Sequence, residues 1–336
     1  MTVQVTTVAL ADLLATARVV ALPLVTRFRG IRVREAMLMR GPVGWTEFAP
    51  FTEYDDNEAS NWLAAAIDYG WNPTPTPLRD RIRVNATVPA VQPHEVAAIL
   101  SKFPGCRTAK VKVAGGDQTL ADDVARVRAV RELLGPEGRI RVDANGGWNI
   151  DEAEHALHAL APCDLEYVEQ PCASVAELAE LRERTAYMDI PIAADESVRR
   201  ASDPLAVAAS GAVDLLVVKA APLGGIRAAL TIVAGAGLPV TVSSALDTSV
   251  GLAMGAALAA SLPDLPYDCG LGTASLLAAD VVKTPLHPID GCIPTGRVTV
   301  DNDLLERYAV AHDRAQWWVA RLSRCHALLT TAGGGR

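Results

Sequence analysis

Five charged residues each close a short apolar run of the chain, and their types suit metal chemistry. They are two basic and three acidic side chains: Lys112, Asp143, Glu169, Asp195 and Lys219. Three carboxylates that converge in a desolvated pocket repel one another unless a cation lies among them. All-oxygen ligation favours a hard divalent ion, so this pattern predicts Mg²⁺, with Mn²⁺ as the other choice.

A pair of lysines supplies the second half of the chemistry. Lys110 and Lys112 are two residues apart, so a strand would carry both on one face. Inside a barrel, like charge and partial burial would lower the pKa of an ammonium and let one lysine act as a base. Lys219, four strands further on, would flank the metal from the other side. Such a site suits removal of the hydrogen next to a metal-bound carboxylate, followed by racemisation, cycloisomerisation or β-elimination.

Strand-like and helix-like segments alternate from about residue 83 onward, which would bring these residues together. The polar residues that close successive strands, from Lys112 through Ser244 to Gly270, are spaced by 31, 26, 26, 24, 25 and 26 residues. One βα unit fits each step, which predicts an α/β fold with a parallel sheet closed into a (β/α) barrel and one shared mouth. The predicted strands are 84–88, 109–113, 140–143, 165–169, 192–195, 215–219, 240–243 and 267–270. The predicted helices are 120–134, 150–160, 175–184, 204–210, 225–234 and 250–262, with Asp151 and Asp203 near two helix starts.

Both ends of the chain lie outside this period and predict a separate α+β capping domain. Its expected elements are strands at 3–8, 30–39 and 44–47, a helix at 58–68 and a proline-rich linker at 73–77. Trp317 and Trp318 in the tail could pack back on the N-terminal unit. The predicted domains are a cap of residues 1–82, completed by 287–336, and a catalytic barrel of residues 83–286.

The composition excludes several other classes of protein. Half of the 336 residues are hydrophobic, which excludes disorder as the main state. A net charge of −8 without a basic run argues against nucleic acid or an anionic membrane as a partner. The uncharged stretch 228–246 is broken by glycine and proline, so it predicts a buried helix, turn and strand and not a membrane span. Six scattered cysteines in a chain of this size indicate reduced thiols and a cytoplasmic protein.

Five segments, taken in order, resemble the muconate-lactonising subgroup of the enolase superfamily over essentially the whole chain. They are Lys110-Val-Lys112, Val142-Asp143-Ala144-Asn145-Gly146, Val168-Glu169-Gln170-Pro171, Ala194-Asp195-Glu196-Ser197 and Val218-Lys219. The resemblance implies a modified (β/α)7β barrel with an N-terminal cap. It also implies that Asp143, Glu169 and Asp195 bind the metal, and that the substrate is a small-molecule carboxylate.

Three further segments resemble the dehydratases of this subgroup that form o-succinylbenzoate for menaquinone. They are Arg27-Phe-Arg29-Gly30-Ile31, Ser243-Ser244-Ala-Leu-Asp247-Thr-Ser249-Val-Gly251 and Gly270-Leu-Gly272-Thr273. Asp247 and Gly272 depart from the usual glutamate and aspartate of the family. The implied reaction is metal-dependent syn-dehydration of 2-succinyl-6-hydroxy-2,4-cyclohexadiene-1-carboxylate through an enediolate that the metal stabilises, which makes the chain a carbon–oxygen lyase.

The same resemblance implies a role for each remaining polar residue of the mouth. Lys112 would remove the α-proton and return it to the departing hydroxyl, Lys219 would stabilise the enediolate from the opposite face, and Lys110 would tune Lys112. Contacts to the substrate, or support behind the metal ligands, are expected from Asn145, Glu196, Ser243, Ser244, Gly270, Arg27 and Arg29.

Three alternatives stay open at this point, as does the oligomeric state. Racemisation of N-succinylamino acids, or another cycloisomerase-type reaction, would use the same metal and both lysines. A Schiff-base aldolase would use Lys219 without a metal. A barrel that binds a ligand without catalysis is the third.

Overall fold

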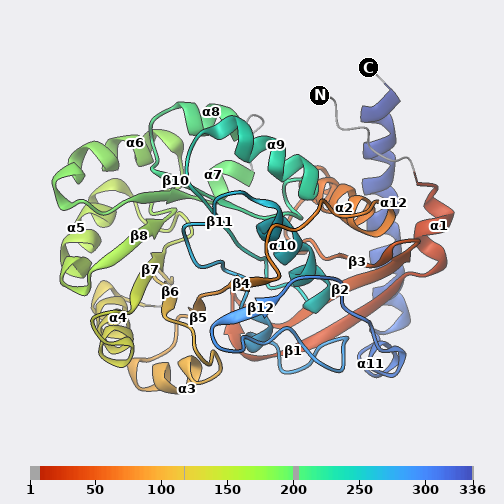
Figure 1. The fold of residues 1–336 in the computed structure, drawn as a ribbon, viewed down its shortest axis with the longest axis horizontal. Helices are drawn as coiled ribbons and strands as arrows, with labels where there is room; N and C mark the ends of the chain where they lie inside the picture. The colour runs from red at the N-terminus through yellow and green to blue at the C-terminus, as the bar shows by residue number, and fades with distance from the viewer. Residues whose placement is uncertain (1–7, 117, 200–203, 335–336) are drawn as a thin grey trace.

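The centre of the molecule is a sheet of seven parallel strands curled into a barrel. The computed structural model describes residues 8–116, 118–199 and 204–334. The strand order is β11-β10-β9-β8-β7-β6-β5, so each strand lies beside its neighbours in sequence. The strands are β5 (Ala86–Val88), β6 (Thr108–Lys112), β7 (Arg139–Asp143), β8 (Leu165–Glu169), β9 (Ile192–Ala194), β10 (Leu215–Val218) and β11 (Val240–Val242). Figure 1 shows these strands ringed by helices on one side of the molecule.

The predicted last strand at 267–270 is not a regular strand but a bridge that closes the barrel. Cys269 pairs with Val84, and Gly270 pairs with Ser243. The Gly270 N–H donates to the Val242 carbonyl at 2.8 Å, which joins this segment to β11. A Cβ on Gly270 would lie 2.4 Å from Ser243 Oγ, so a residue without a side chain is needed for this close approach. The prediction of a full strand was therefore wrong in length, although the segment is in the expected place.

Helices cover the outside of the barrel, six of them at the predicted positions, whereas α3 and α7 were not predicted. They are α3 (Val96–Leu100), α4 (Leu120–Leu134), α5 (Ile150–Leu160), α6 (Val175–Arg184), α7 (Glu196–Arg199), α8 (Pro204–Ala209), α9 (Ile226–Ala236) and α10 (Ser249–Ser261). Short 3₁₀ turns lie at Pro93–Glu95, Ala161–Cys163, Ala186–Met188 and Thr273–Leu276. Asp151 lies in the first turn of α5, near the helix start as predicted, and the N-cap is Asn149, whose side chain accepts from the Glu152 N–H. Asp203 lies outside the described residues.

The N-terminal unit is a three-stranded antiparallel sheet with helices packed on it. Its elements are α1 (Leu10–Ala15), β1 (Arg18–Phe28), β2 (Ile31–Gly41), β3 (Gly44–Phe48) and α2 (Asp56–Trp71). The sequence did not predict β1, because its apolar residues run on from those before it without clear alternation. The predicted strand at 3–8 lies outside the described residues except for Val8, which belongs to no strand.

The C-terminal tail returns to the N-terminal unit. It contains β12 (Cys292–Pro294), α11 (Asn302–Arg307) and α12 (His312–Gly334), and β12 pairs with β4 (Arg81–Arg83). Helix α12 packs along α2 beside the three-stranded sheet (Figure 1). Trp318 is fully buried there, with its ring edge-on to Phe48 and its Nε1 donating to Glu35, as the tail prediction required. The domain limits at 82/83 and 286/287 stay a prediction.

Among the described residues, no helix is both long enough and apolar enough to cross a membrane. The uncharged stretch 228–246 is instead the end of α9, a turn and β11.

Candidate active site

The strand register brings the lysine pair against two of the carboxylates. Lys112 on β6 is aligned with Asp143 on β7, and Asp143 is aligned with Glu169 on β8. Lys110 Nζ donates to Asp143 Oδ2 and to Glu169 Oε1, both at 2.8 Å. Lys112 Nζ donates to Asp143 Oδ2 at 2.5 Å and to Asn145 Oδ1 at 2.7 Å. Alternation along β6 thus places both lysines on the inner face, as the period of two requires.

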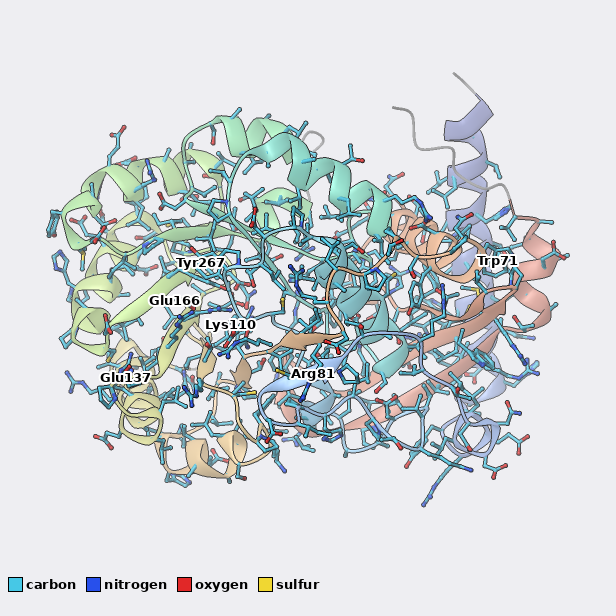
Figure 2. The ribbon with its side chains drawn as sticks, in the orientation of Figure 1. Trp71, Arg81, Lys110, Glu137, Glu166 and Tyr267 are labelled. Atoms are coloured by element: carbon cyan, nitrogen blue, oxygen red, sulfur yellow. The ribbon has the colours of Figure 1, made fainter. Side chains whose placement is uncertain are left out.

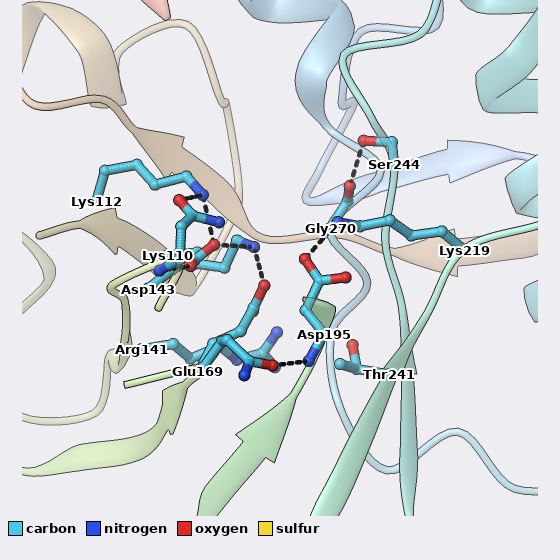
Figure 3. A network of polar contacts seen from close by, with 12 residues as sticks. Lys110, Lys112, Arg141, Asp143, Glu169, Asp195, Lys219, Thr241, Ser244 and Gly270 are labelled. Carbon is cyan, nitrogen blue, oxygen red and sulfur yellow. Dashed lines mark hydrogen bonds and ion pairs between the residues drawn. The ribbon is translucent and has the colours of Figure 1, made fainter. Parts of the chain in front are cut away.

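The third carboxylate lies with the third lysine on the other side of the mouth. Asp195 directly follows β9, and Lys219 directly follows β10. Lys219 Nζ donates to Asp195 Oδ2 at 2.5 Å. Figure 3 shows Lys112 and Lys219 entering from opposite sides, with the three carboxylates between them.

Burial and neighbouring charges shift the pKa values of the carboxyl groups of this site in opposite directions. Burial, together with the negative charge of Asp143, raises the pKa of Glu169 to about 8. Burial acts on Asp143 in the same sense, but the ammonium groups of Lys110 and Lys112 hold its pKa well below the ordinary value. The pKa of Asp195 is likewise low despite burial, because Lys219 and Arg199 face it.

The two lysines of β6 differ from each other although they are neighbours. Burial would lower the pKa of Lys110, but Asp143 and Glu169 hold it well above the ordinary value. Burial lowers the pKa of Lys112, and the charge of Lys110 adds to this effect. Lys112 is therefore the better base of the pair, whereas Lys110 is a fixed cation between two carboxylates.

Two of the three carboxylates have an oxygen that is available as a ligand for a divalent cation. Glu169 Oε2 and Asp195 Oδ1 are buried and accept no hydrogen bond from the described residues. Buried carboxylate oxygens without donors are costly, and hard cations take such oxygens as ligands. Among the described residues, no group of three or more His, Cys, Asp or Glu side chains could hold a metal ion as they stand. Each of the three carboxylates is paired with a lysine. The three predicted metal ligands stay a prediction.

Glu196, which was expected to contact the substrate or to support the metal ligands, contacts Asn145 and Arg199. It is the first residue of α7, and its Oε1 accepts from Asn145 Nδ2 and Arg199 Nη2 at 3.3 and 3.2 Å. Its other oxygen, Oε2, is buried without a hydrogen-bond partner among the described residues.

Gln170 is a residue of the site that sequence reasoning missed. Its Oε1 accepts from the backbone N–H groups of Asp195 and Ser197 at 3.0 and 3.1 Å, and its Nε2 donates to Ser197 Oγ at 2.7 Å. The amide therefore fixes the start of the loop after β9 and with it the direction of Asp195. Its position directly after Glu169 was the available signal.

An inner pocket lies between the lysines and the N-terminal unit. Its lining includes Lys112, Lys219, Ser243, Gly270, Phe28 and Leu246. Asn145, Ser244 and Arg29 also line it, so most of the residues that were predicted to contact the substrate or to support the metal ligands lie around this pocket. Ser244 Oγ donates to the Gly270 carbonyl at 2.7 Å, which ties it to the barrel closure.

A wider outer pocket continues from the inner pocket toward solvent. Arg27 lines it from the end of β1 and Arg29 from the turn between β1 and β2, while Lys112 and Asn145 line it from the barrel. Phe28 lines both pockets, with its ring centroid 5.7 Å from Lys112 Nζ. Phe28 and Leu246 were not predicted as site residues, because apolar side chains give no chemical signal in a sequence.

Below the carboxylates, the barrel interior is filled by a buried arginine and two tyrosines. Arg141 donates to Glu166 Oε2 at 2.5 Å, and its guanidinium lies 4.8 Å from the ring centroid of Tyr167 and 5.7 Å from that of Tyr267. A register shift between β7 and β8 lets Glu166 face this arginine. Figure 2 shows Lys110, Glu166 and Tyr267 grouped among the barrel strands, far from Trp71 in the N-terminal unit. The floor of the site is thus polar but closely packed.

Both parts of the chain, the barrel and the N-terminal unit, match models of known protein families. Residues 95–297 match the enolase C-terminal domain-like family, and residues 19–70 match the enolase N-terminal domain-like family. The chain therefore belongs to the enolase superfamily.

Curated relatives of the chain within that superfamily include o-succinylbenzoate synthases. The protein of that name from Thermobifida fusca is 55% identical over 93% of this chain and 96% of its own length. The one from Mycobacterium leprae is 53% identical over 97% of this chain and 96% of its own length. Identity at this level over nearly full length places the chain in their family.

Solved structures share the fold at much lower identity. The muconate lactonizing enzyme from Pseudomonas fluorescens, complexed with muconolactone, has a TM-score of 0.74 at 19% identity and covers 88% of this chain and 98% of its own. The L-Ala-D/L-Glu epimerase from Bacillus subtilis has a TM-score of 0.69 at 23% identity, covering 84% and 96%. These likenesses establish the two-part architecture.

Proposed function

We propose that the chain is a carbon–oxygen lyase that dehydrates 2-succinyl-6-hydroxy-2,4-cyclohexadiene-1-carboxylate to o-succinylbenzoate, a step of menaquinone synthesis. The observation that carries this proposal is the pair of amines, Lys112 and Lys219, on opposite sides of one pocket with three carboxylates between them. Its o-succinylbenzoate synthase relatives, at 53–55% identity, support the choice of reaction.

Lys112 is the base in this proposal. Its Nζ takes the proton from the ring carbon that bears the carboxylate, since its pKa is lowered by burial and by Lys110. The same Nζ then gives that proton to the hydroxyl leaving the adjacent carbon, so water departs and the ring becomes aromatic. No electrons are exchanged with the enzyme. Base and acid on one face of the ring make the elimination syn.

Lys219 stabilises the negative charge that develops on the substrate carboxylate as the proton leaves. It faces the pocket from the end of β10, opposite Lys112. A fixed ammonium in a buried site is effective because it needs no reorganisation during the reaction. Lys110 keeps the charge of Asp143 and Glu169 balanced and keeps Lys112 less basic.

Members of the enolase superfamily use divalent metal ions, and we propose Mg²⁺ for this chain, held by Asp143, Glu169 and Asp195. The ion would supply positive charge that acidifies the hydrogen next to the substrate carboxylate. The unpartnered oxygens of Glu169 and Asp195 support this assignment. Asn145, Glu196, Ser243, Ser244, Gly270, Arg27 and Arg29 are proposed to contact the substrate or to orient these groups.

We further propose that the protein acts in the cytoplasm on this small anionic substrate. All six cysteines are free, which agrees with a reducing compartment.

Turnover of the cyclohexadiene carboxylate tests the proposal. Formation of o-succinylbenzoate would be followed with Mg²⁺ and again after EDTA treatment. We expect turnover with Mg²⁺, loss of turnover with EDTA, and recovery when Mg²⁺ is added back. A purified, folded enzyme that forms no o-succinylbenzoate with Mg²⁺ would exclude this function.

A further inference from the structure

Two side chains of the N-terminal unit hold the turn that follows β11. From β2, Arg34 donates through Nε to the Leu246 carbonyl at 3.1 Å and through Nη2 to the Ala245 carbonyl at 3.4 Å. From β3, Glu47 accepts from the Thr248 N–H at 3.1 Å and from the Thr248 hydroxyl. Residues 245–248 are thus fixed by partners that lie 212 and 201 positions away in the chain.

The turn has a backbone conformation that its sequence disfavours. Leu246 has φ +60°, in the left-handed region that leucine seldom enters. Asp247 Oδ2 accepts from the Ala245 N–H at 3.1 Å and closes the turn from within. A bulky residue stays in this region only where the surrounding contacts impose it, and such positions cluster at functional sites.

Arg34 is built into this contact and is not a surface cation. It is only 3% exposed, and its guanidinium lies 4.3 Å from the ring centroid of Phe51. Within the described residues, its side chain donates to backbone carbonyls, which include those of Ala49 and Glu35. A planar fork can contact several carbonyls at once, whereas a lysine ammonium cannot match that geometry.

Helix α10 packs directly against the same cluster. A Cβ on Gly251 would lie 2.7 Å from Asp247 Cβ and 2.9 Å from Glu47 Oε1. The first turn of the helix therefore leaves no space into which Glu47 or the turn could relax. The conformation of residues 245–248 is determined jointly by the helix and the two side chains of the N-terminal unit.

This turn forms a wall of the active site. Ala245 and Leu246 line the inner pocket together with Lys112 and Lys219. We propose that Arg34 and Glu47 are positioning residues that hold Leu246 in its left-handed conformation, and that the Leu246 side chain thereby selects a flat apolar ring beside the reacting carboxylate. The choice of substrate rests on the proposed function, whereas the control of the turn by Arg34 does not.

A double-mutant comparison tests this inference. Asparagine enters the left-handed region readily, so Leu246→Asn keeps the turn but removes the apolar wall. We expect Arg34→Lys and Leu246→Asn each to raise KM for the cyclohexadiene substrate, and the Kd for o-succinylbenzoate, by about 10-fold, with kcat within about threefold. The double variant should resemble Leu246→Asn alone, because the wall that Arg34 positions is already gone.

Arg32 is an exposed arginine on the same strand, so Arg32→Lys is the matched control and should leave KM unchanged. Additive effects in the double variant would overturn the inference, as would an Arg34→Lys enzyme that loses thermal stability but keeps the wild-type KM. If Arg34→Lys does not fold, Glu47→Ala frees the other side of the turn and takes its place in the same comparison.

A crystal structure of the Arg34→Lys variant tests whether Arg34 controls the turn, and it needs no activity assay. We expect Leu246 to leave the left-handed region and its side chain to withdraw from the inner pocket. An unchanged turn would overturn the inference even if the wild-type enzyme is active. If instead the wild-type enzyme fails to turn over the substrate, the proposed function fails while this structure still decides whether Arg34 controls the turn.

Discussion

At the scale of single residues, two lysines on one strand have different tasks because their neighbours differ. Lys110 lies between Asp143 and Glu169, so its pKa is held well above the ordinary value. Lys112 pairs with only one of these carboxylates, Asp143, and its side chain lines the pockets. One carboxylate does not offset the effect of burial, so the pKa of Lys112 is lowered. The strand therefore supplies one fixed cation and one proton carrier within two residues.

Substitution of the opposite lysine separates dehydration from racemisation. Dehydration needs only a cation at Lys219, so Lys219→Arg should keep roughly 1–10% of kcat, whereas Lys219→Met should lose about 10²–10³-fold. Racemisation needs a proton carrier there, so both variants would be equally inactive. Steady-state kinetics of the two variants decide the matter, and equal loss of dehydration in both would contradict the cation role.

At the scale of elements, the strand spacing carried most of the correct prediction. One βα unit per 24–31 residues fixed which charged residues meet, and the register of β6, β7 and β8 aligns them as expected. The contacts of Arg34, Phe28 and Leu246 could not be predicted, because they join residues far apart in sequence and depend on one unusual φ angle. Strand β1 was missed since its apolar residues have no clear period.

The contact between β3 and α10 predicts a pH dependence of stability. Burial, together with the negative charge of Asp247, raises the pKa of Glu47 to about 8. The native chain thus keeps a proton on Glu47 up to about pH 8, whereas the unfolded chain loses it near pH 4.5. The associated stability is complete below pH 4.5 and is lost as the pH rises to about 8, with a slope of at most about 1.4 kcal/mol per pH unit.

Glu47→Gln should flatten this slope because glutamine does not titrate. Urea unfolding at pH 6, 7, 8 and 9 measures the free energy of unfolding for the variant and the wild type. Glu137→Gln, at an exposed position, is the control and should keep the wild-type slope. Equal slopes in wild type and Glu47→Gln would show that Glu47 does not hold the proton.

At the scale of the whole molecule, the two ends of the chain form one unit against the barrel. Helix α12 brings Trp318 onto the sheet of the N-terminal unit, where Nε1 donates to Glu35 Oε2 at 2.9 Å. The net charge of −8 opposes an anionic substrate, so attraction must be local. Lys112, Lys219, Arg27 and Arg29 around the two pockets supply that local positive charge.

Removal of the buried tryptophan should loosen this unit. Trp318→Ala should reduce the free energy of unfolding by about 3–5 kcal/mol, because a large aromatic core side chain is lost. The neighbouring Trp317 is only partly buried, so Trp317→Ala should lose less than half as much. Urea unfolding of both variants checks this, and equal losses would contradict the packing described for α12.

The most direct measurement of the central claim is kcat for dehydration by Lys112→Ala with saturating Mg²⁺. Lys283→Ala, which removes an exposed lysine paired with Asp301, is the matched control. We predict that Lys112→Ala lowers kcat by about 10²–10⁴-fold while the control keeps the wild-type value, because the proton carrier is lost. If Lys112→Ala keeps more than about a tenth of wild-type kcat, Lys112 is not the base and the account of this site is wrong.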